Sequence, residues 1–224
     1  MRERGMIFNA EMVRAILNGS KTQTRRVMKP QPTPDDYVCP YDGPRGGHIW
    51  PSKNHQYGLH VELMMQNGEG HWDGLASQAC PFGEVGDRIW VREAYRVMGC
   101  ATDVARLTYK ASERNSFTES TRTVPVGTCT KQPSQNWTPS IHMPRWASRI
   151  LLEITAVRVE RLQAITLGDI CKEIGCGLYD FRPATYGFQV WEELWKSIYG
   201  EENWQVNPWV WVIEFKRVET TDEQ

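Results

Sequence analysis

No long hydrophobic run is present in this sequence. Among its 224 residues, no apolar stretch approaches the roughly 18 residues that a membrane-spanning helix needs. The amino-terminal residues Met1-Arg2-Glu3-Arg4 also differ from a secretory signal, which requires an apolar stretch. These absences predict a protein with no membrane partner and a cytoplasmic location.

Closely spaced cysteines are also absent. The six cysteines are spread thinly, whereas small secreted domains use a tight, even-numbered disulfide framework. We therefore expect free thiols. Cys39 and Cys80 lie at the two ends of a stretch that contains four histidines. A zinc ion coordinated by these residues could stabilise that stretch. Because no C-x-x-C pair supports such a site, the sequence predicts neither a metal nor another cofactor. The four histidines are His48, His55, His60 and His71.

An excess of positive charge is the third feature that the sequence lacks. Lysines and arginines number 26 against 27 acidic residues, which gives a formal net charge of -1. No global positive field therefore attracts nucleic acid, and any binding of phosphate must rest on local clusters. One such cluster is formed by Lys21, Arg25, Arg26 and Lys29.

Tryptophan, by contrast, is abundant, with 10 residues. A tryptophan side chain packs in a core or offers a flat surface on which a base can stack. Trp191 and Trp195 lie at helical spacing on an apolar face, which favours packing. Both interpretations stay open for Trp90, Trp146, Trp209 and Trp211.

Helices are predicted where apolar residues recur at helical spacing between capping residues. Residues 9–18 form one such helix, with Gly19 at the position of a C-cap. A second helix is predicted over 167–174, with Thr166 and Asp169 as a capping box and Gly175 at its end. A third is predicted over 185–199.

Strands are predicted where β-prone residues follow turn signals. The run 88–95 follows Gly86-Asp87, and residues 106–110 could pair with it. Another strand is predicted over 209–215. The long strand predicted over 150–162 changes phase, because Ile150, Leu152 and Ile154 alternate and Val157 and Val159 then take the opposite parity. Such a slip implies a bulge or a bend, as strands of barrels often need.

These elements predict an α+β fold, a small, partly open β-barrel flanked by short helices. We expect a single domain over residues 1–224, because no linker divides the chain. Two long stretches, about 28–82 and 113–145, are rich in turn-forming residues and are predicted to be irregular insertions, the first with room for a hairpin of its own. The sequence does not specify an oligomeric state.

The segment from Gly19 to Arg26 concentrates polar chemistry. It carries an amine, two guanidinium groups and several hydroxyl or amide groups directly after a predicted helix end. In a straight strand Lys21 and Thr24 would face opposite sides, so the backbone must turn if both contact one ligand. Loops on a rigid scaffold often collect binding groups in this way. The alternative is a solvated basic turn.

This segment, Gly19-x-Lys21-x-x-Thr24-x-Arg26, resembles the G-x-K-x-x-T-x-R signature of the ASCH domain, a family of the PUA-like barrel superfamily. Further matches follow in order: Val85-Gly86-Asp87 before a strand, the long strand ending near Leu162, the short helix bearing Glu173, and the terminal strand at Ile213-Glu214-Phe215. The two insertions are not covered. The whole chain is similar to longer ASCH proteins of bacteriophages and prophages.

The resemblance implies a PUA-like fold with a cleft for a nucleobase, a nucleoside or RNA. The small bacterial members are N4-acetylcytidine amidohydrolases that use a Lys, a Thr and a Glu, which correspond here to Lys21, Thr24 and Glu173. A Thr hydroxyl beside a desolvated Lys can supply a nucleophile and a proton acceptor, and the Glu can transfer a proton or position water. Arg26 would stabilise charge on the carbonyl oxygen.

Other residues are candidates for ligand binding rather than catalysis. Gly19 and Arg25 belong to the signature segment, Trp90 offers a stacking surface, and His142 lies in a stretch rich in Arg and Trp. A packed tryptophan and a structural histidine are the alternatives for the last two.

Three functions fit the sequence. The first is hydrolysis of the N4-acyl amide of a modified cytidine. The second is non-catalytic binding of RNA or a modified nucleotide, which would weaken steeply with salt. The third is a phage accessory protein whose insertions contact a host protein. Because a fold does not fix a function, the sequence leaves open whether the chain is an enzyme and which nucleoside it takes.

Overall fold

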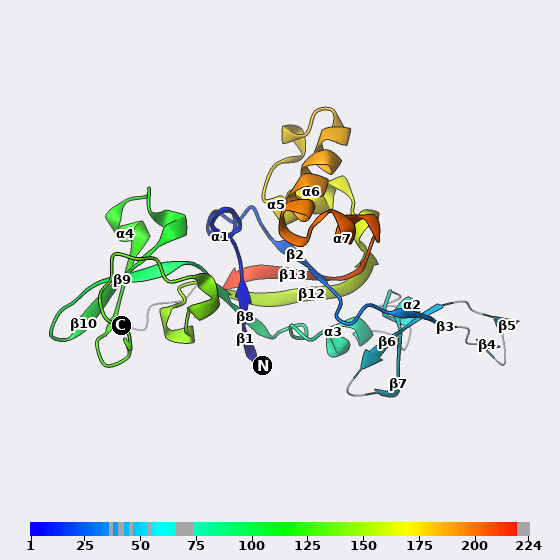
Figure 1. Cartoon of the computed structure of the whole chain (residues 1–224), viewed down its shortest axis with the longest axis horizontal. Helices are drawn as coiled ribbons and strands as arrows, with labels where there is room; N and C mark the ends of the chain where they lie inside the picture. The colour runs from blue at the N-terminus through cyan, green and yellow to red at the C-terminus, as the bar shows by residue number, and fades with distance from the viewer. Residues whose placement is uncertain (36–37, 40–42, 45–46, 53–54, 66–73, 219–224) are drawn as a thin grey trace. The chain divides into compact units, whose positions relative to one another are not determined.

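A computed structural model describes residues 1–35, 38–39, 43–44, 47–52, 55–65 and 74–218 (Figure 1). The chain divides into two compact units, each assembled from separate stretches of sequence. Unit 1 comprises Met1–Lys21, Asp87–Glu153 and Lys216–Gln224, and unit 2 comprises Thr22–Gly86 and Ile154–Phe215. The two predicted insertions therefore fall in different units, 28–82 in unit 2 and 113–145 in unit 1.

Unit 1 contains two groups of paired strands. Strand β1 (Glu3–Ile7) pairs in parallel with β8 (Arg88–Arg92), which pairs antiparallel with the first residues of β12 (Leu151–Arg161). An antiparallel sheet has the order β11-β10-β9. Its strands are β9 (Tyr95–Cys100), β10 (Val104–Tyr109) and β11 (Thr121–Pro125). The helices are α1 (Ala10–Leu17), α4 (Phe117–Ser120) and the 3-10 turns η2 (Lys110–Ser112), η3 (Ser140–His142) and η4 (Arg145–Ala147).

The core of unit 1 lies against the β11-β10-β9 sheet. Tyr95 and Tyr109 are fully buried there with Leu107. Tyr109 donates its hydroxyl hydrogen to the carbonyl oxygen of Ala147 at 2.8 Å, which satisfies a polar group inside an apolar cluster. Burial raises the pKa of the Tyr95 hydroxyl to about 12. These aromatic residues therefore serve as packing groups that stay protonated.

Unit 2 is built around strand β13 (Trp209–Val218), which pairs antiparallel with β2 (Gln23–Val27). The helices that follow β12 are η5 (Leu162–Ala164), α5 (Leu167–Ile174), η6 (Leu178–Asp180), α6 (Ala184–Tyr199) and α7 (Glu201–Gln205). The described residues between β2 and Gly86 include the sheet β3-β6-β7, the pair β4-β5, and two helices. These are β3 (Thr33–Asp35), β4 (Val38–Cys39), β5 (Gly43–Pro44), β6 (Gly47–Ser52), β7 (His55–His60), α2 (Val61–Met65) and α3 (Leu75–Ala79).

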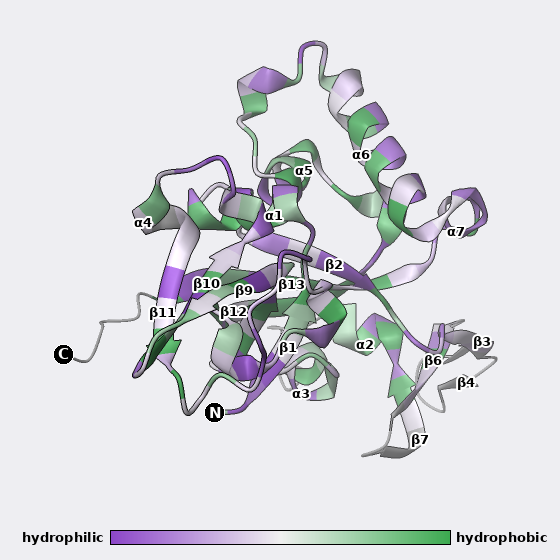
Figure 2. Ribbon diagram, turned by 60° about the vertical axis from the view of Figure 1, so that its left-hand side comes forward, coloured by the Kyte–Doolittle hydropathy of each residue, from purple (hydrophilic) through white to green (hydrophobic). Residues whose placement is uncertain are grey.

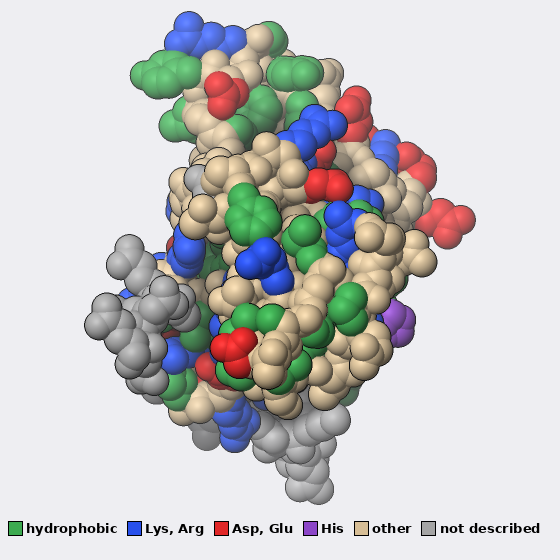
Figure 3. Space-filling view, turned by 90° about the vertical axis from the view of Figure 1, so that its left-hand side faces the viewer, with side chains coloured by type: hydrophobic (Ala, Val, Ile, Leu, Met, Phe, Trp, Pro, Cys, Tyr) green, Lys and Arg blue, Asp and Glu red, His purple; other side chains and the backbone are tan. Residues whose placement is uncertain are grey.

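The helices of unit 2 are amphipathic and bury aromatic side chains. In Figure 2 hydrophobic and hydrophilic residues alternate along the turns of α6. Trp191 and Trp195 are each 2% exposed and pack against Ile170 of α5 and Val210 and Val212 of β13. The predicted packing role of these two tryptophans is confirmed. On the face shown in Figure 3, basic and acidic side chains are interspersed, in keeping with the net charge of -1.

The α+β fold class is confirmed, and several local predictions hold. Thr166 caps α5, because its side-chain oxygen accepts from the backbone N–H of Asp169, and Gly175 ends the helix with a φ of 86°. In β12 Leu152 and Ile154 are buried, and then Val157 and Val159, which confirms the predicted change of phase; Leu151, at the start of the strand, is buried as well. A hairpin, β6-β7, lies within the first predicted insertion.

The pairing predicted for the run 88–95 is wrong in part. The run divides into β8 and β9, and β10 pairs with β9 rather than with β8. The break falls at Glu93, whose buried carboxylate forms an ion pair with Arg149. The backbone N–H of Glu93 donates to Met143 Sδ at 3.2 Å, so it is not available for a ladder with a neighbouring strand. Among the described residues, the pairings within either unit do not close a barrel, and no helix is long and apolar enough to cross a membrane.

Gly187 and Gly168 offer a matched pair of substitutions in unit 2. A Cβ added at Gly187, inside α6, would lie 2.5 Å from Leu167 Cδ1 and 2.9 Å from the Phe181 ring, whereas one added at Gly168, in α5, meets only an atom at 3.8 Å. Ala normally stabilises a helix by about 1 kcal/mol relative to Gly. We expect Gly168→Ala to raise the free energy of unfolding and Gly187→Ala to lower it by roughly 1–3 kcal/mol through overpacking.

Urea denaturation followed by circular dichroism measures both changes. A stabilising Gly187→Ala would show that α6 is not packed closely against Leu167 and Phe181.

Candidate functional site

The signature segment begins where α1 ends. Asn9 caps the helix by accepting from the backbone N–H of Met12 at 2.8 Å. Gly19 then adopts a φ of 78°, a left-handed conformation that favours glycine. The N–H of Lys21 donates to the carbonyl of Ala15 at 2.9 Å, which turns the chain back on the helix. The chain therefore turns between α1 and Lys21, ahead of β2.

Burial distinguishes the residues of this segment. Lys21 in unit 1 is 2% exposed, and Thr24 and Arg25 in unit 2 are 1% and 2% exposed. Arg26 is half-buried and Lys29 is exposed. These exposures exclude the alternative of a solvated basic turn. Only Arg26 and Lys29 of the predicted basic cluster reach the surface.

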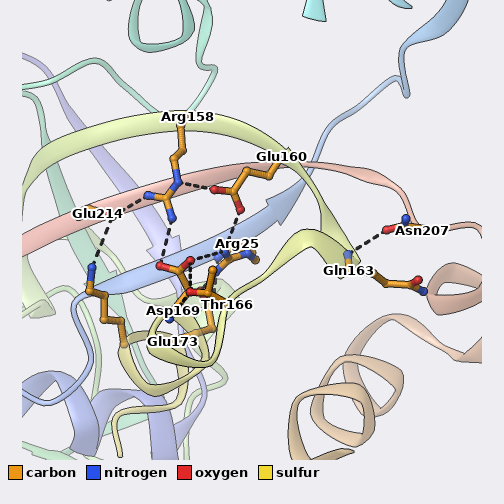
Figure 4. A network of polar contacts seen from close by, with 10 residues as sticks. Arg25, Arg158, Glu160, Gln163, Thr166, Asp169, Glu173, Asn207 and Glu214 are labelled. Atoms are coloured by element: carbon orange, nitrogen blue, oxygen red, sulfur yellow. Dashed lines mark hydrogen bonds and ion pairs between the residues drawn. The ribbon is translucent and has the colours of Figure 1, made fainter. Parts of the chain in front are cut away.

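Arg25 lies at the centre of a buried network of charges (Figure 4). Its Nη2 is 3.0 Å from Glu160 Oε2 and 3.7 Å from Asp169 Oδ2, and its Nη1 is 3.5 Å from Glu173 Oε2. Its side chain is fully buried. A guanidinium held by three carboxylates has an internal role. The sequence placed Arg25 in a basic cluster for binding phosphate. In the structure its charge is instead compensated by carboxylates of the protein.

Arg158 completes the network from the side of β12. It contacts Glu160 through Nε, Asp169 through Nη2 at 3.2 Å and Glu214 through Nη1 at 2.6 Å. Two carboxylates, Glu160 and Asp169, are thus shared between Arg25 and Arg158. Shared carboxylates fix the positions of both guanidinium groups, because each carboxylate has more than one charged partner.

The neighbouring amide of Gln23 extends the same network. In the amide orientation that satisfies both of its groups, Gln23 accepts from Arg25 Nη1 at 2.5 Å and donates to Asp169 Oδ1 at 3.0 Å. Asp169 also accepts from the Thr166 hydroxyl at 2.9 Å. Burial favours the neutral carboxyl of Asp169, but Thr166, Arg25 and Arg158 outweigh it, so the pKa of Asp169 lies below its usual range. Asp169 is therefore ionised at neutral pH.

Glu173 links α5 to β2. Its Oε1 accepts from the backbone N–H of Arg25 at 3.0 Å, and the N–H of Thr22 donates to the carbonyl of Lys172 at 3.1 Å. The sequence placed Glu173 in the last turn of α5, where the helix dipole disfavours an acid. Its contacts with Arg25 compensate for that position, so Glu173 has a structural role whether or not it also acts on a ligand.

Several residues of the network were not identified from the sequence. They are Arg158, Glu160 and Asp169. The two carboxylates contact both Arg25 and Arg158, and none of the three residues was predicted to belong to a functional site. A signal was present for two of them, since Arg158 and Glu160 alternate with the buried Val157 and Val159 and so share one face of β12. Asp169 had been assigned only to the helix cap, and it performs both tasks.

The remaining candidates lie elsewhere. Trp90 is half-buried in β8, with the Arg92 guanidinium 5.4 Å from its ring and Gly5 packed against it. His142 is exposed in η3 and lines a hollow of about 330 Å³ in unit 1. Trp209 and Trp211 are buried and contact His48 and Trp50 edge-on, which settles them as packing residues. Trp146 packs edge-on against Tyr95.

No group of metal-ligating side chains is found within the described part of the chain. The cysteines described there, Cys80, Cys100, Cys129, Cys171 and Cys176, are free thiols. The zinc site considered between Cys39 and Cys80 depends on Cys39, His55 and His71, whose side chains lie outside the described residues.

Comparison with known proteins adds no relative: no family model, no curated protein and no solved structure matches this chain.

Proposed function

We propose that this protein adopts a PUA-like fold of the ASCH type and binds a nucleobase, presented as a free modified nucleoside or within RNA, through the segment Gly19 to Arg26. The G-x-K-x-x-T-x-R signature supports the family. The observation that carries the proposal is the burial of two polar residues of the signature, Lys21 and Thr24, which are 2% and 1% exposed. A lysine is almost never fully buried unless it is paired, and ligand sites place a few polar groups in such surroundings. Lys21 is the buried lysine among those that the structure describes.

The charge balance favours an uncharged ligand over a phosphate at this segment. Arg25 is held by Glu160, Asp169 and Glu173, so its positive charge is compensated within unit 2. The buried hydroxyl of Thr24 and the buried amine of Lys21 match the hydrogen-bonding edge of a base. A site built to bond such groups discriminates strongly against analogues that lack them. A nucleobase therefore suits the segment better than a free anion.

Lys21→Met is the test of this binding. Methionine keeps much of the length of the side chain and removes its charge, and we expect the affinity for N4-acetylcytidine to fall by at least about tenfold, since a hydrogen bond to a charged group is worth about 1.5–3 kcal/mol. Isothermal titration calorimetry measures the affinity. Lys29→Met, at an exposed position eight residues further along the chain, is the matched control and should bind as the wild type does. Equal affinities for wild type and Lys21→Met would sink the proposal.

Hydrolysis of the N4-acyl amide is the second candidate function. It is favoured by the burial of all three residues that the resemblance assigns to catalysis, since Thr24 is 1% and Glu173 3% exposed beside the 2% of Lys21. Water would be the co-reactant, and cytidine and acetate the products.

Thr24→Val preserves the shape of the side chain and removes the hydroxyl. We expect it to reduce the rate of conversion of N4-acetylcytidine to cytidine at least about 100-fold, as removal of a nucleophile or of a major transition-state interaction does. Chromatography of the reaction mixture measures the rate. Wild-type protein that releases no cytidine would exclude hydrolysis while leaving nucleoside binding to be judged by calorimetry.

A further inference from the structure

A second polar region lies within unit 1 and shares no residue with the charge network of unit 2. A cavity of about 740 Å³ is lined there by five arginines. They are Arg14, Arg122, Arg145, Arg149 and Arg217. Hydroxyl and amide side chains of serine, threonine and asparagine line the rest, with a few aliphatic residues, and no acidic side chain of the described residues is part of the lining.

The size of this arginine cavity suits a small organic ligand. Sites for ligands of that kind usually enclose about 300–1,000 Å³ and combine apolar walls with a few polar groups. Leu17, Ile150 and Leu151 supply the apolar part of the wall. The cavity is large enough for a nucleotide or a short stretch of a nucleic-acid strand.

Within the described part of the chain, only two of the five cavity arginines form ion pairs with carboxylates, and those carboxylates lie outside the cavity. Arg149 forms two hydrogen bonds with Glu93, Nε to Oε1 at 2.9 Å and Nη2 to Oε2 at 3.1 Å. Arg145 Nε is 2.7 Å from Glu3 Oε2. These pairs fix the two guanidinium groups and cancel their charge in the immediate surroundings.

The other three arginines are held by uncharged acceptors. Arg122 Nη1 donates to the carbonyl of Ser148 at 2.5 Å, Arg217 Nη1 to that of Leu17 at 3.3 Å, and Arg14 Nη1 to that of Ala111 at 3.4 Å. Within the described residues, none of the three forms an ion pair with a carboxylate. The Leu17 carbonyl belongs to the negative end of α1, which repels anions. Its hydrogen bond to Arg217 therefore reduces the repulsion of an anion from this part of the wall.

Several of the polar groups in the wall are already fixed in position. Arg149 Nη2 donates to the Ser112 hydroxyl at 2.8 Å, and its guanidinium lies 4.1 Å from the centre of the Tyr109 ring. Ser112 and Ser148 are 1% and 3% exposed. A wall fixed before the ligand arrives loses less side-chain entropy on binding.

We propose that the arginine cavity binds phosphate groups, either of a free nucleotide or of the backbone of single-stranded RNA. Guanidinium groups match phosphate oxygens with paired hydrogen bonds, and they keep their charge at any physiological pH. Three arginines held by carbonyl groups around one cavity provide a local positive potential that the whole chain, with its net charge of -1, does not have. This site is distinct from the proposed nucleoside segment and does not depend on it.

The test uses a triple variant, Arg14→Gln, Arg122→Gln and Arg217→Gln, in the full chain. All three side chains are exposed, and glutamine can still donate to the backbone carbonyls, so the fold should persist and is checked by circular dichroism. The probes are a fluorescein-labelled single-stranded RNA, followed by anisotropy, and cytidine triphosphate with inorganic tripolyphosphate, followed by calorimetry. Arg106→Gln, exposed in β10 and outside the cavity, is the matched control.

The wild type and Arg106→Gln are expected to bind, and the triple variant is expected to bind at least about 100-fold more weakly, because each charge-assisted bond is worth about tenfold or more. If RNA is the ligand, the slope of log affinity against log salt also falls by about 0.7 for each phosphate that the variant no longer neutralises. Binding of cytidine triphosphate and tripolyphosphate without RNA identifies a free nucleotide, and binding of RNA alone identifies the backbone. No binding of any probe, or equal binding by the triple variant, overturns the proposal.

Where the triple variant fails to fold, the single variants Arg122→Gln and Arg217→Gln replace it, each with an expected decrease in affinity of about tenfold. The outcome is separable from that of the nucleoside site. Lys21→Met should reduce binding of uncharged N4-acetylcytidine and leave binding of tripolyphosphate unchanged, and the triple variant should do the reverse.

Discussion

Arg25→Met is expected to reduce the free energy of unfolding by about 3–5 kcal/mol, the usual effect of removing one partner of a buried ion pair. Arg158 still contacts Glu160 and Asp169 in this variant, but Glu173, only 3% exposed, is deprived of the guanidinium 3.5 Å from its Oε2. The variant therefore leaves a carboxylate buried without that partner. Urea denaturation at neutral pH measures the change.

Arg158→Met is the matched control for this prediction. Its side chain is 28% exposed, so water can solvate the carboxylates that it releases. We expect Arg158→Met to lower the free energy of unfolding by less than half as much as Arg25→Met does. Adding Glu173→Gln to Arg25→Met should restore part of the stability, because the amide oxygen can still accept from the backbone N–H of residue 25. A decrease below about 1 kcal/mol in Arg25→Met would contradict the network described around it.

Arg149→Met is expected to have a comparable effect in unit 1, about 3–5 kcal/mol at neutral pH. Glu93 is 2% exposed and is bound through both of its oxygens by Arg149. Burial raises the pKa of Glu93 above its ordinary value of 4.5, and Arg149 opposes that rise. Without Arg149, the pKa of Glu93 should rise further.

The sign of the pH dependence follows from this shift. A carboxyl whose pKa is higher in the folded state binds its proton more tightly there, so ionisation destabilises the fold as the pH rises above 4.5. The destabilisation caused by Arg149→Met should therefore be largest at neutral pH and shrink as the pH falls towards 4.5. Denaturation curves at several pH values measure it, and in a Glu93→Gln background the destabilisation caused by Arg149→Met should change little with pH. A destabilisation independent of pH would rule out Glu93 as its cause.

Features with local signals could be predicted from the sequence. Thr166, Gly175 and Gly19 mark helix ends through their own conformational preferences, and the structure places each of them at a helix end. The changed parity of Val157 and Val159 likewise appears directly in the burial of β12. Each of these predictions depends on residues close together in the chain.

Features that depend on distant partners could not be predicted. Arg25 and Glu173 are 148 positions apart, and Arg25 and Glu160 are 135 apart. From the sequence Arg25 belonged to a basic cluster with Arg26 and Lys29, because charge patterns within a segment do not show which side chains become buried. The arginine cavity is assembled from α1, β11, η4 and the ends of β12 and β13, so no single segment indicates it.

The two polar regions differ in the kind of ligand that they suit. In unit 2 the guanidinium of Arg25 is compensated by carboxylates, whereas in unit 1 Arg14, Arg122 and Arg217 are held by carbonyl groups. We propose uncharged base chemistry for the signature segment and phosphate chemistry for the arginine cavity. Each region is nevertheless testable alone.

Equilibrium dialysis against N4-acetylcytidine, free and within a short RNA, tests the proposed nucleoside function most directly when both chambers are analysed by chromatography. The proposal predicts that N4-acetylcytidine accumulates in the chamber that holds the wild-type protein, or that cytidine is formed, and that Lys21→Met does neither with the free nucleoside. Equal distribution of unchanged N4-acetylcytidine in both forms, at protein concentrations in the millimolar range, would contradict it.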